Sequence, residues 1–155
     1  MNHLKLQLKI PPVVQGALAM AGIWLAARYL PLCRFEFRYQ TAAAWILAGA
    51  GLLVAVAGIL AFIKLKTTVD PRRPDEATEL VIIGIYRYSR NPMYLGILLV
   101  LAGAAIYSGA FSTILVAASF VWFINRFQIA PEEAALQNKF KESYRRYRQK
   151  VRRWL

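Results

Sequence analysis

Charged residues are missing from three long stretches of this 155-residue sequence. No Asp, Glu, Lys or Arg occurs from position 10 to 27, from 41 to 63, or from 91 to 125. A helix needs about 20 apolar residues to cross a bilayer, so the first two stretches each fit one helix and the third fits two short ones. Ser108 and Gly109 form the natural turn within the third stretch. The sequence therefore predicts an all-α integral membrane fold with four transmembrane helices, in which residues 1–155 form one membrane domain.

The distribution of basic residues predicts how the chain is oriented. Its formal net charge is +12, although 58% of its residues are hydrophobic. With four spans, both termini and the loop of residues 64–90 lie on one side. Two Lys or Arg precede residue 10, six lie in that loop and eight fall between 139 and 153, against Arg28, Arg34 and Arg38 opposite. The positive-inside rule makes the basic side, with both termini, cytoplasmic. Attraction to anionic headgroups explains the basic excess, so we expect membrane lipids and no nucleic acid as partners.

The sequence offers few metal ligands. Cys33 is its only cysteine and His3 its only histidine, close to the N-terminus. A thiolate cluster or an internal disulfide is therefore impossible within this chain, and we expect no metal site.

The first two helices, expected at about 12–30 and 41–64, form a scaffold. Small residues recur through the second one, where they permit close helix packing in lipid; they are Ala44, Ala48, Gly51, Ala55 and Gly58. Helices expected at about 92–107 and 111–129 form an antiparallel hairpin. The apolar residues 80–83 are too few to span and are expected to form a cap or re-entrant segment that lines a cavity.

Pro131 opens a further helix, expected from 132 to about 151. Its apolar residues recur at spacings of three and four and form one stripe: Leu136, Phe140, Tyr144, Tyr147, Val151 and Trp154. Lys and Arg fill the other faces. The pattern predicts a C-terminal amphipathic cytoplasmic helix that lies on the membrane or on the bundle.

Two charged groups are expected to meet at the cytoplasmic face. Asn91 suits a helix N-cap and Pro92 the first helical position. The free N–H groups that follow, with Arg90 just upstream, would hold an anion such as a carboxylate. The hairpin returns Arg126 and the adjacent Glu132 and Glu133 to the same place. Cations and carboxylates together would hold a zwitterion at both ends. Each charged group also has a simpler interpretation. Arg90 could be a basic residue that flanks a membrane helix, and Glu132 and Glu133 could be acidic residues that stabilise the start of a helix.

The order of these residues resembles that of the isoprenylcysteine carboxyl methyltransferase and phospholipid methyltransferase superfamily, over about residues 65–155. Two blocks carry the likeness: residues 80–96, and the acidic pair followed by Leu136, Phe140, Tyr144, Tyr147 and Val151. The resemblance implies a membrane methyltransferase that takes S-adenosylmethionine from the cytosol and methylates a lipophilic acceptor, leaving S-adenosylhomocysteine. It implies cofactor binding by Leu80, Val81, Gly84, Tyr86, Arg90, Asn91, Pro92, Tyr94, Leu95 and Gly96, with Glu132 and Glu133 as acidic partners. Arg126 falls where relatives place an arginine near the acceptor, as a catalytic residue.

We expect Arg90 to hold the methionine carboxylate of this cofactor and the acidic pair to bind its amino or ribose hydroxyl groups. Tyr86 and Tyr94 would shape the pocket and meet the sulfonium by a cation–π contact. Methyl transfer from a sulfonium is an in-line displacement, in which alignment and exclusion of water supply the rate without a metal.

The chain departs from the family pattern at three positions. Asn91 and Thr78 stand where histidines are usual, and Lys141 stands where a Phe-Gly pair is usual. The departures leave two acceptors open, a prenylcysteine-like carboxylate that Arg126 would orient and a lipid amine. Two other classes also remain open. A small four-helix transporter of cationic compounds would need a carboxylate inside its spans, which this sequence lacks, and a non-catalytic membrane scaffold would need none of the charged residues.

Overall fold

The computed structural model describes residues 10–65 and 79–155. Over these residues the chain is helical apart from its connections. It contains no β-strand there, only one isolated antiparallel bridge between Arg34 and Ala110. The elements are α1 (Pro12–Tyr29), α2 (Gln40–Lys64), the short 3-10 helix η3 (Gly84–Arg87), α3 (Pro92–Ser108), α4 (Phe111–Ile124), the π-helical turn η4 (Asn125–Ile129) and α5 (Ala130–Lys150). The predicted all-α class is confirmed. Thr78 lies outside the described residues.

Local signals place most of the helix ends. Pro12 and Pro92 occupy first-turn positions of α1 and α3, where a missing N–H costs nothing. Gly109 ends α3 with φ 64°, a left-handed conformation that glycine adopts without strain. The predicted turn at Ser108 and Gly109 is confirmed, and the α1–α2 connection packs along it through a 2.8 Å hydrogen bond from Phe35 N to Gly109 O.

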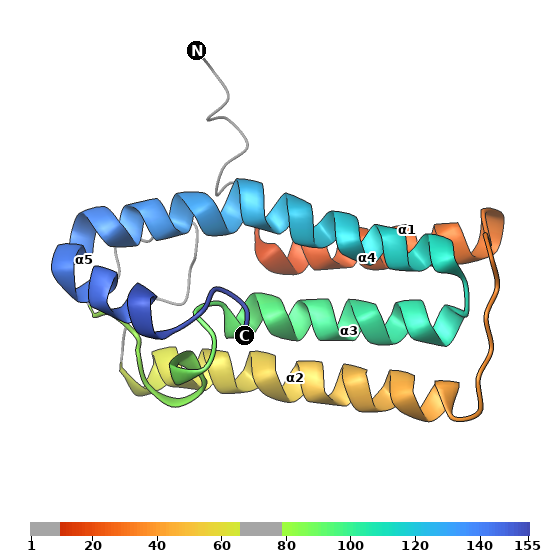
Figure 1. Cartoon of the computed structure of the whole chain (residues 1–155), viewed down its shortest axis with the longest axis horizontal. Helices are drawn as coiled ribbons and strands as arrows, with labels where there is room; N and C mark the ends of the chain where they lie inside the picture. Colours follow the sequence, from red (N-terminus) through yellow and green to blue (C-terminus); the bar gives the residue numbers. More distant parts are fainter. Residues whose placement is uncertain (1–9, 66–78) are drawn as a thin grey trace, which may run out of the picture.

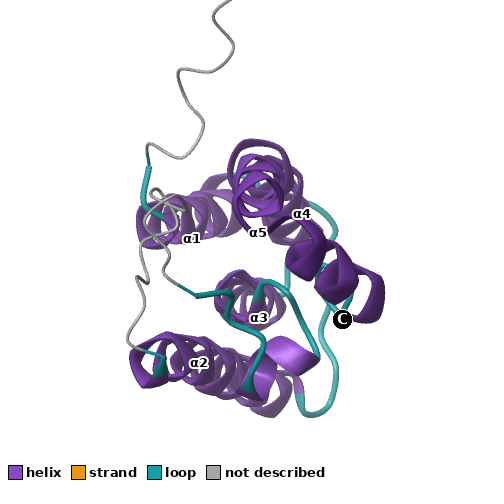
Figure 2. Cartoon of the chain, turned by 90° about the vertical axis from the view of Figure 1, so that its left-hand side faces the viewer, coloured by secondary structure: helices purple, strands orange, loops and turns teal. Residues whose placement is uncertain are grey.

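The helices lie roughly parallel in two pairs, with α2 beside α3 and α1 beside α4 (Figures 1 and 2). The α2–α3 pair is held together by glycine-to-glycine contact. A Cβ on Gly96 would come within 2.5 Å of Gly51 O, and one on Gly51 within 2.6 Å of Gly96 O. A Cβ on Gly103 would meet Ala44 O at 2.7 Å. The expected close packing by the small residues of the second helix is confirmed.

The packed core lies between α1, α3 and α4. Its buried apolar members are Ile23, Tyr94, Leu101, Ala105, Ala117, Phe120, Ile124 and Ile129. Much of the remaining apolar surface points outward, including Trp45, Ile46, Leu53 and Trp122 at 65–72% exposure. Such a continuous apolar exterior is unfavourable in water and is what a lipid-facing surface requires.

Two described helices are long and apolar enough to cross a membrane by length and composition, α2 and the continuous helix Phe111–Lys150. The apolar part of the second ends where charges begin at Arg126. Helix α3 is apolar but shorter, with 17 residues. Only 17% of the apolar window of α2 is buried, whereas the core helix of a soluble protein is mostly buried. The fold is therefore that of a helical membrane protein with two candidate spans by this measure, rather than the four expected.

The C-terminal helix differs from the single helix expected over residues 132–151. Lys141 has φ 45° and ψ −113°, which breaks α5 and turns its last part back toward the start of α3 (Figure 1). Tyr144 and Val151 are consequently buried, and Trp154 packs against the core. The expected single helix is thus broken at Lys141. Of the two placements expected for it, on the membrane or on the bundle, the structure shows the second half of the apolar stripe packed on the protein itself.

Candidate active site

The start of α3 is held by the C-terminal segment of residues 151–154. Arg90 N donates to Arg152 O at 3.0 Å, and Asn91 Nδ2 donates to Arg153 O at 2.9 Å. Asn91 occupies the N-cap position as expected, but its side chain makes no capping hydrogen bond. The amide is turned instead toward the returning chain, which has carbonyl groups that need donors. The first turn of α3 therefore has no side-chain cap.

Glu133 lies between two arginines. Arg90 NH2 is 3.2 Å from Glu133 Oε1, and Arg153 NH2 is 2.6 Å from Glu133 Oε2. Arg153 Nε also donates to Glu133 Oε1 at 3.2 Å, and this hydrogen bond and the carboxylate charge raise the pKa of Arg153. The side chains of Arg90 and Glu133 are only 9% and 10% exposed. The hairpin thus brings the cationic and acidic residues together, as the sequence predicted.

Arg90 keeps donor capacity beyond this ion pair. Its Nε and NH1 atoms are buried and have no hydrogen-bond partner among the described residues. Buried guanidinium groups are normally fully hydrogen-bonded, because an unpartnered donor loses its hydration without compensation. Nε and NH1 lie on different edges of the guanidinium plane, so each can donate separately to an oxygen of a carboxylate or a phosphate. Arg90 is therefore a candidate anion ligand, with Glu133 fixing its position.

Glu132 provides the acidic half of the site. Tyr94, from the first turn of α3, donates to Glu132 Oε2 at 2.8 Å. The pKa of Glu132 is raised to about 7: burial is the main cause, the charge of Glu133 adds to it, and the hydrogen bond from Tyr94 opposes both. A carboxylate destabilised in this way gains from a cationic or hydroxyl partner.

Tyr86 and Val81 support the site from the loop before α3. Val81 and Tyr86 pack with Ala61 in a second apolar cluster at the end of α2, so the expected cap segment covers that helix end. Tyr147 Oη donates to Tyr86 O at 2.7 Å, which fixes the folded-back part of α5 to this loop. Burial, and then the charge of Glu132, raise the pKa of Tyr86. The ring is therefore a neutral wall near the acidic pair.

Other residues of the expected cofactor set have visible packing roles. Leu95, Pro92 and Gly96 are buried, and Gly96 is the contact with α2 described above. Leu80 is half-buried, while Gly84 is exposed with φ 58° and starts η3. These residues shape the backbone around Arg90. None of them has a polar side chain, so none can offer a side-chain hydrogen bond to a ligand.

Arg126 does not join this network. It is exposed, whereas its neighbour Asn125 accepts from Arg153 NH1 at 3.4 Å. Adjacent residues on a helix point about 100° apart, and the π-helical turn at residues 125–129 changes the phase of everything that follows. The structure therefore places Asn125, rather than Arg126, beside the ion pair.

Sequence reasoning missed Arg153, Ser89 and Gln128. Ser89 is 1% exposed and its Oγ accepts from Asn91 N at 3.1 Å. Gln128 is 1% exposed and interacts with the Tyr94 hydroxyl. Arg153 counted only as one of eight C-terminal basic residues. Of these three residues, only Gln128 could have been noticed in the sequence, because it is an uncharged polar residue one position before the end of the apolar helix expected at 111–129.

The chain belongs to the phospholipid methyltransferase family, whose model matches residues 39–143. It is 33% identical over 113 residues to a protein-S-isoprenylcysteine O-methyltransferase of Schizosaccharomyces pombe, an alignment that covers 73% of this chain and 48% of that protein. The chain thus spans about half the length of this relative. It is also 49% identical over 63 residues to an uncharacterized protein of Haemophilus influenzae, covering 41% of this chain and 100% of that protein. No solved structure matches. The family resemblance in the sequence is confirmed.

Proposed function

We propose that this protein transfers a methyl group from S-adenosylmethionine to a lipophilic acceptor at the cytoplasmic face of a membrane. The observation that carries the proposal is the buried Arg90, which has two unpartnered donors, beside the Glu132 carboxylate, within a methyltransferase family. One zwitterionic ligand satisfies both groups. Neither a carboxylate nor an ammonium alone does so.

The residues present fit the cofactor. Arg90 would bind its carboxylate through Nε or NH1, and Glu132 would bind its amino group or ribose hydroxyls. Glu133 is already paired with two arginines, so its task is to position Arg90 rather than to bind the ligand. Tyr86 and Tyr94 would form the wall around the sulfonium. When bound, the cofactor supplies an activated methyl group, and S-adenosylhomocysteine is the product.

The protein contributes alignment and exclusion of water. The two ends of the ligand are held by groups from different elements, Arg90 before α3 and Glu132 on α5, which fixes its orientation. Residues 151–154 lie against the start of α3 and separate it from the solvent. Acceptor attack on a methyl group needs no metal, and no cluster of three or more candidate metal ligands occurs among residues 10–65 and 79–155.

We infer that four helices span the membrane, with both termini cytoplasmic. Helices α1 and α3 lie alongside the two candidate spans (Figure 1). Helix α1 exposes large apolar side chains such as Leu18 and Trp24, and α3 consists almost wholly of apolar residues. Cys33 offers a direct test, because it is the only cysteine, is exposed and lies in the α1–α2 connection. A membrane-impermeant maleimide should label Cys33 in intact cells. Labelling only after permeabilisation would reverse the orientation.

Calorimetry with S-adenosylhomocysteine on purified protein in detergent tests the cofactor. We expect binding that weakens at least about tenfold in Arg90→Ala, Glu132→Ala and Glu133→Ala, because each loses a charge-assisted hydrogen bond. Arg146→Ala and Glu142→Ala are matched controls. These residues form an exposed i,i+4 pair on the same helix and should leave binding unchanged. Absence of heat in the wild-type protein under several lipids would contradict the proposal and favour the transporter or the scaffold.

The acceptor is tested separately. Tritiated-methyl transfer is measured with prenylcysteine analogues and with phosphatidylethanolamine, the two acceptor classes left open. Because Arg126 is exposed and outside the ion-pair network, we expect Arg126→Ala to retain cofactor binding. A role for Arg126 with an anionic acceptor predicts a raised KM for the prenylcysteine analogue alone. An unchanged KM would assign Arg126 to lipid headgroups.

A further inference from the structure

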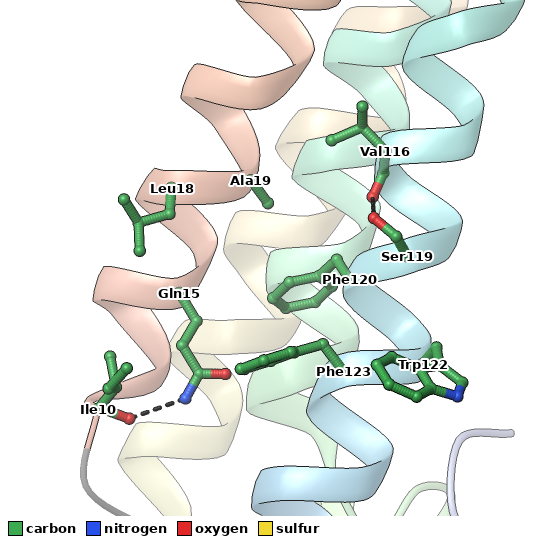
Figure 3. Close-up of a pocket in the computed structure, with 9 residues that line it drawn as sticks. All are labelled: Ile10, Gln15, Leu18, Ala19, Val116, Ser119, Phe120, Trp122 and Phe123. Carbon is green, nitrogen blue, oxygen red and sulfur yellow. Dashed lines mark hydrogen bonds between the residues drawn. The ribbon is translucent and has the colours of Figure 1, made fainter. Parts of the chain in front are cut away.

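An apolar groove runs between α1 and α4 on the outer face of the bundle (Figure 3). Its volume is about 400 Å³, and its walls are formed mainly by Leu18 and Ala19 of α1 and by Val116, Phe120 and Phe123 of α4. Figure 3 shows the Phe123 ring lying beside the Gln15 side chain, with Phe120 one turn further along the groove. Among residues 10–65 and 79–155, no charged residue lines it. The groove therefore suits an alkyl chain.

One end of the groove is polar. Gln15 is 7% exposed, and its Nε2 donates to Ile10 O at 2.8 Å and to Gln128 Oε1 at 3.2 Å. Gln15 Oε1 is buried without a hydrogen-bond partner among the described residues, and Gln15 is the polar side chain at this end of the groove. A free acceptor complements a group that donates, such as a hydroxyl or an amine. Leaving this atom unpartnered is unfavourable, so the site favours such a ligand.

This polar end connects to the candidate active site. Gln128 interacts with the Tyr94 hydroxyl, which in turn donates to Glu132. The groove is thus separated from the proposed donor site by one amide and one phenol. The first carboxylate along this path is Glu132, which repels an anionic ligand and tolerates a neutral or cationic one.

We propose that the α1–α4 groove binds the methyl acceptor, with its alkyl chain between Phe120, Phe123 and Leu18 and its hydroxyl or amine end at Gln15. The assignment rests on the proposed methyltransferase function. It makes Gln15 a specificity-determining residue, positioned by Gln128, and it selects against acceptors that end in a carboxylate.

Photo-crosslinking tests the proposal directly. Three probes carry a diazirine at the same carbon of a dodecyl chain and end in an alcohol, an amine or a carboxylate. The full-length protein is labelled in detergent, and the sites are mapped by mass spectrometry. We expect saturable labelling of the α1 and α4 peptides by the alcohol or the amine, at least about tenfold above the carboxylate and displaced by unlabelled dodecanol or dodecylamine. The two preferred probes distinguish an O–H from an N–H acceptor.

Two variants and one control complete the test. Ala19→Phe fills the groove and should abolish labelling, while Gln15→Leu should keep labelling but remove the headgroup preference. Leu53→Phe, on the exposed face of α2 at 72% exposure, should change neither. Circular dichroism confirms that each variant is folded. Labelling that does not saturate, or that persists in Ala19→Phe, would mean annular lipid and overturn the inference. If that occurs while S-adenosylhomocysteine still binds, only the groove assignment fails; absence of S-adenosylhomocysteine binding overturns the proposed function itself.

Discussion

Replacing Gly96 by alanine is expected to destabilise the protein, because the α2–α3 contact leaves no room for a methyl group. The added Cβ would lie 2.5 Å from Gly51 O, 2.7 Å from Ala55 Cβ and 2.8 Å from Ala55 N. Two of these three atoms belong to the backbone, which cannot rotate away. Overpacking typically costs about 1–3 kcal/mol. The same change gains about 1 kcal/mol in helix propensity.

Gly49→Ala is the matched control. Gly49 lies on α2 near the same contact, but a Cβ there meets nothing within 4 Å. This variant should keep the full propensity gain of about 1 kcal/mol. We therefore expect the Gly96 variant to be less stable than the Gly49 variant by about 1–3 kcal/mol, the overpacking term alone. Unfolding by sodium dodecyl sulfate, followed by far-ultraviolet circular dichroism, measures the difference.

The comparison also separates packing from ligand binding at a residue that the family resemblance places in the cofactor motif. A packing role predicts that the stability of Gly96→Ala falls without ligand present. Equal stabilities for the two variants would refute the close-contact reasoning and leave cofactor binding as the explanation for this glycine.

Three further predictions follow from the C-terminal half. Lys141→Gly should raise the free energy of unfolding by about 1–3 kcal/mol in the same assay, since glycine adopts φ 45° without strain, whereas Asn138→Gly in regular helix should lower it by about 0.3 kcal/mol. A double-mutant cycle between Arg153 and Glu133 should give a coupling of about 1 kcal/mol, because Arg153 is partly exposed, and a coupling near zero would remove Arg153 from the network. Binding of S-adenosylhomocysteine at pH 7 should release protons. The pKa of Glu132 is raised to about 7, and a cationic ligand group lowers it, so the heat should depend on the buffer at pH 7, and this dependence should be lost in Glu132→Gln.

The sequence predicted the helices well because the relevant signals are local. Segregated charges delimit the apolar helices, Pro92 and Gly109 mark helix ends, and the small residues of α2 mark its packing face. The meeting of Arg90 with Glu133 was also predictable, since a hairpin of two short helices returns the chain to its starting side.

The remainder depended on contacts between distant residues. Asn91 binds a carbonyl 62 residues away, and Arg153 reaches Glu133 only because the chain bends at Lys141. A lysine gives no indication that its φ is positive. The Phe-Gly pair that is usual at this place in the family does, because glycine favours a positive φ. The π-helical turn η4 explains why Asn125 rather than Arg126 faces the ion pair, and a regular helical period cannot reveal such a turn.

A crystal structure with bound S-adenosylhomocysteine tests the central claim most directly. The account predicts its carboxylate within hydrogen-bond distance of Arg90 Nε or NH1, its amino group or ribose beside Glu132, and Glu133 still paired with Arg90. A ligand bound elsewhere, or one that leaves those two guanidinium nitrogens unpartnered, would contradict it.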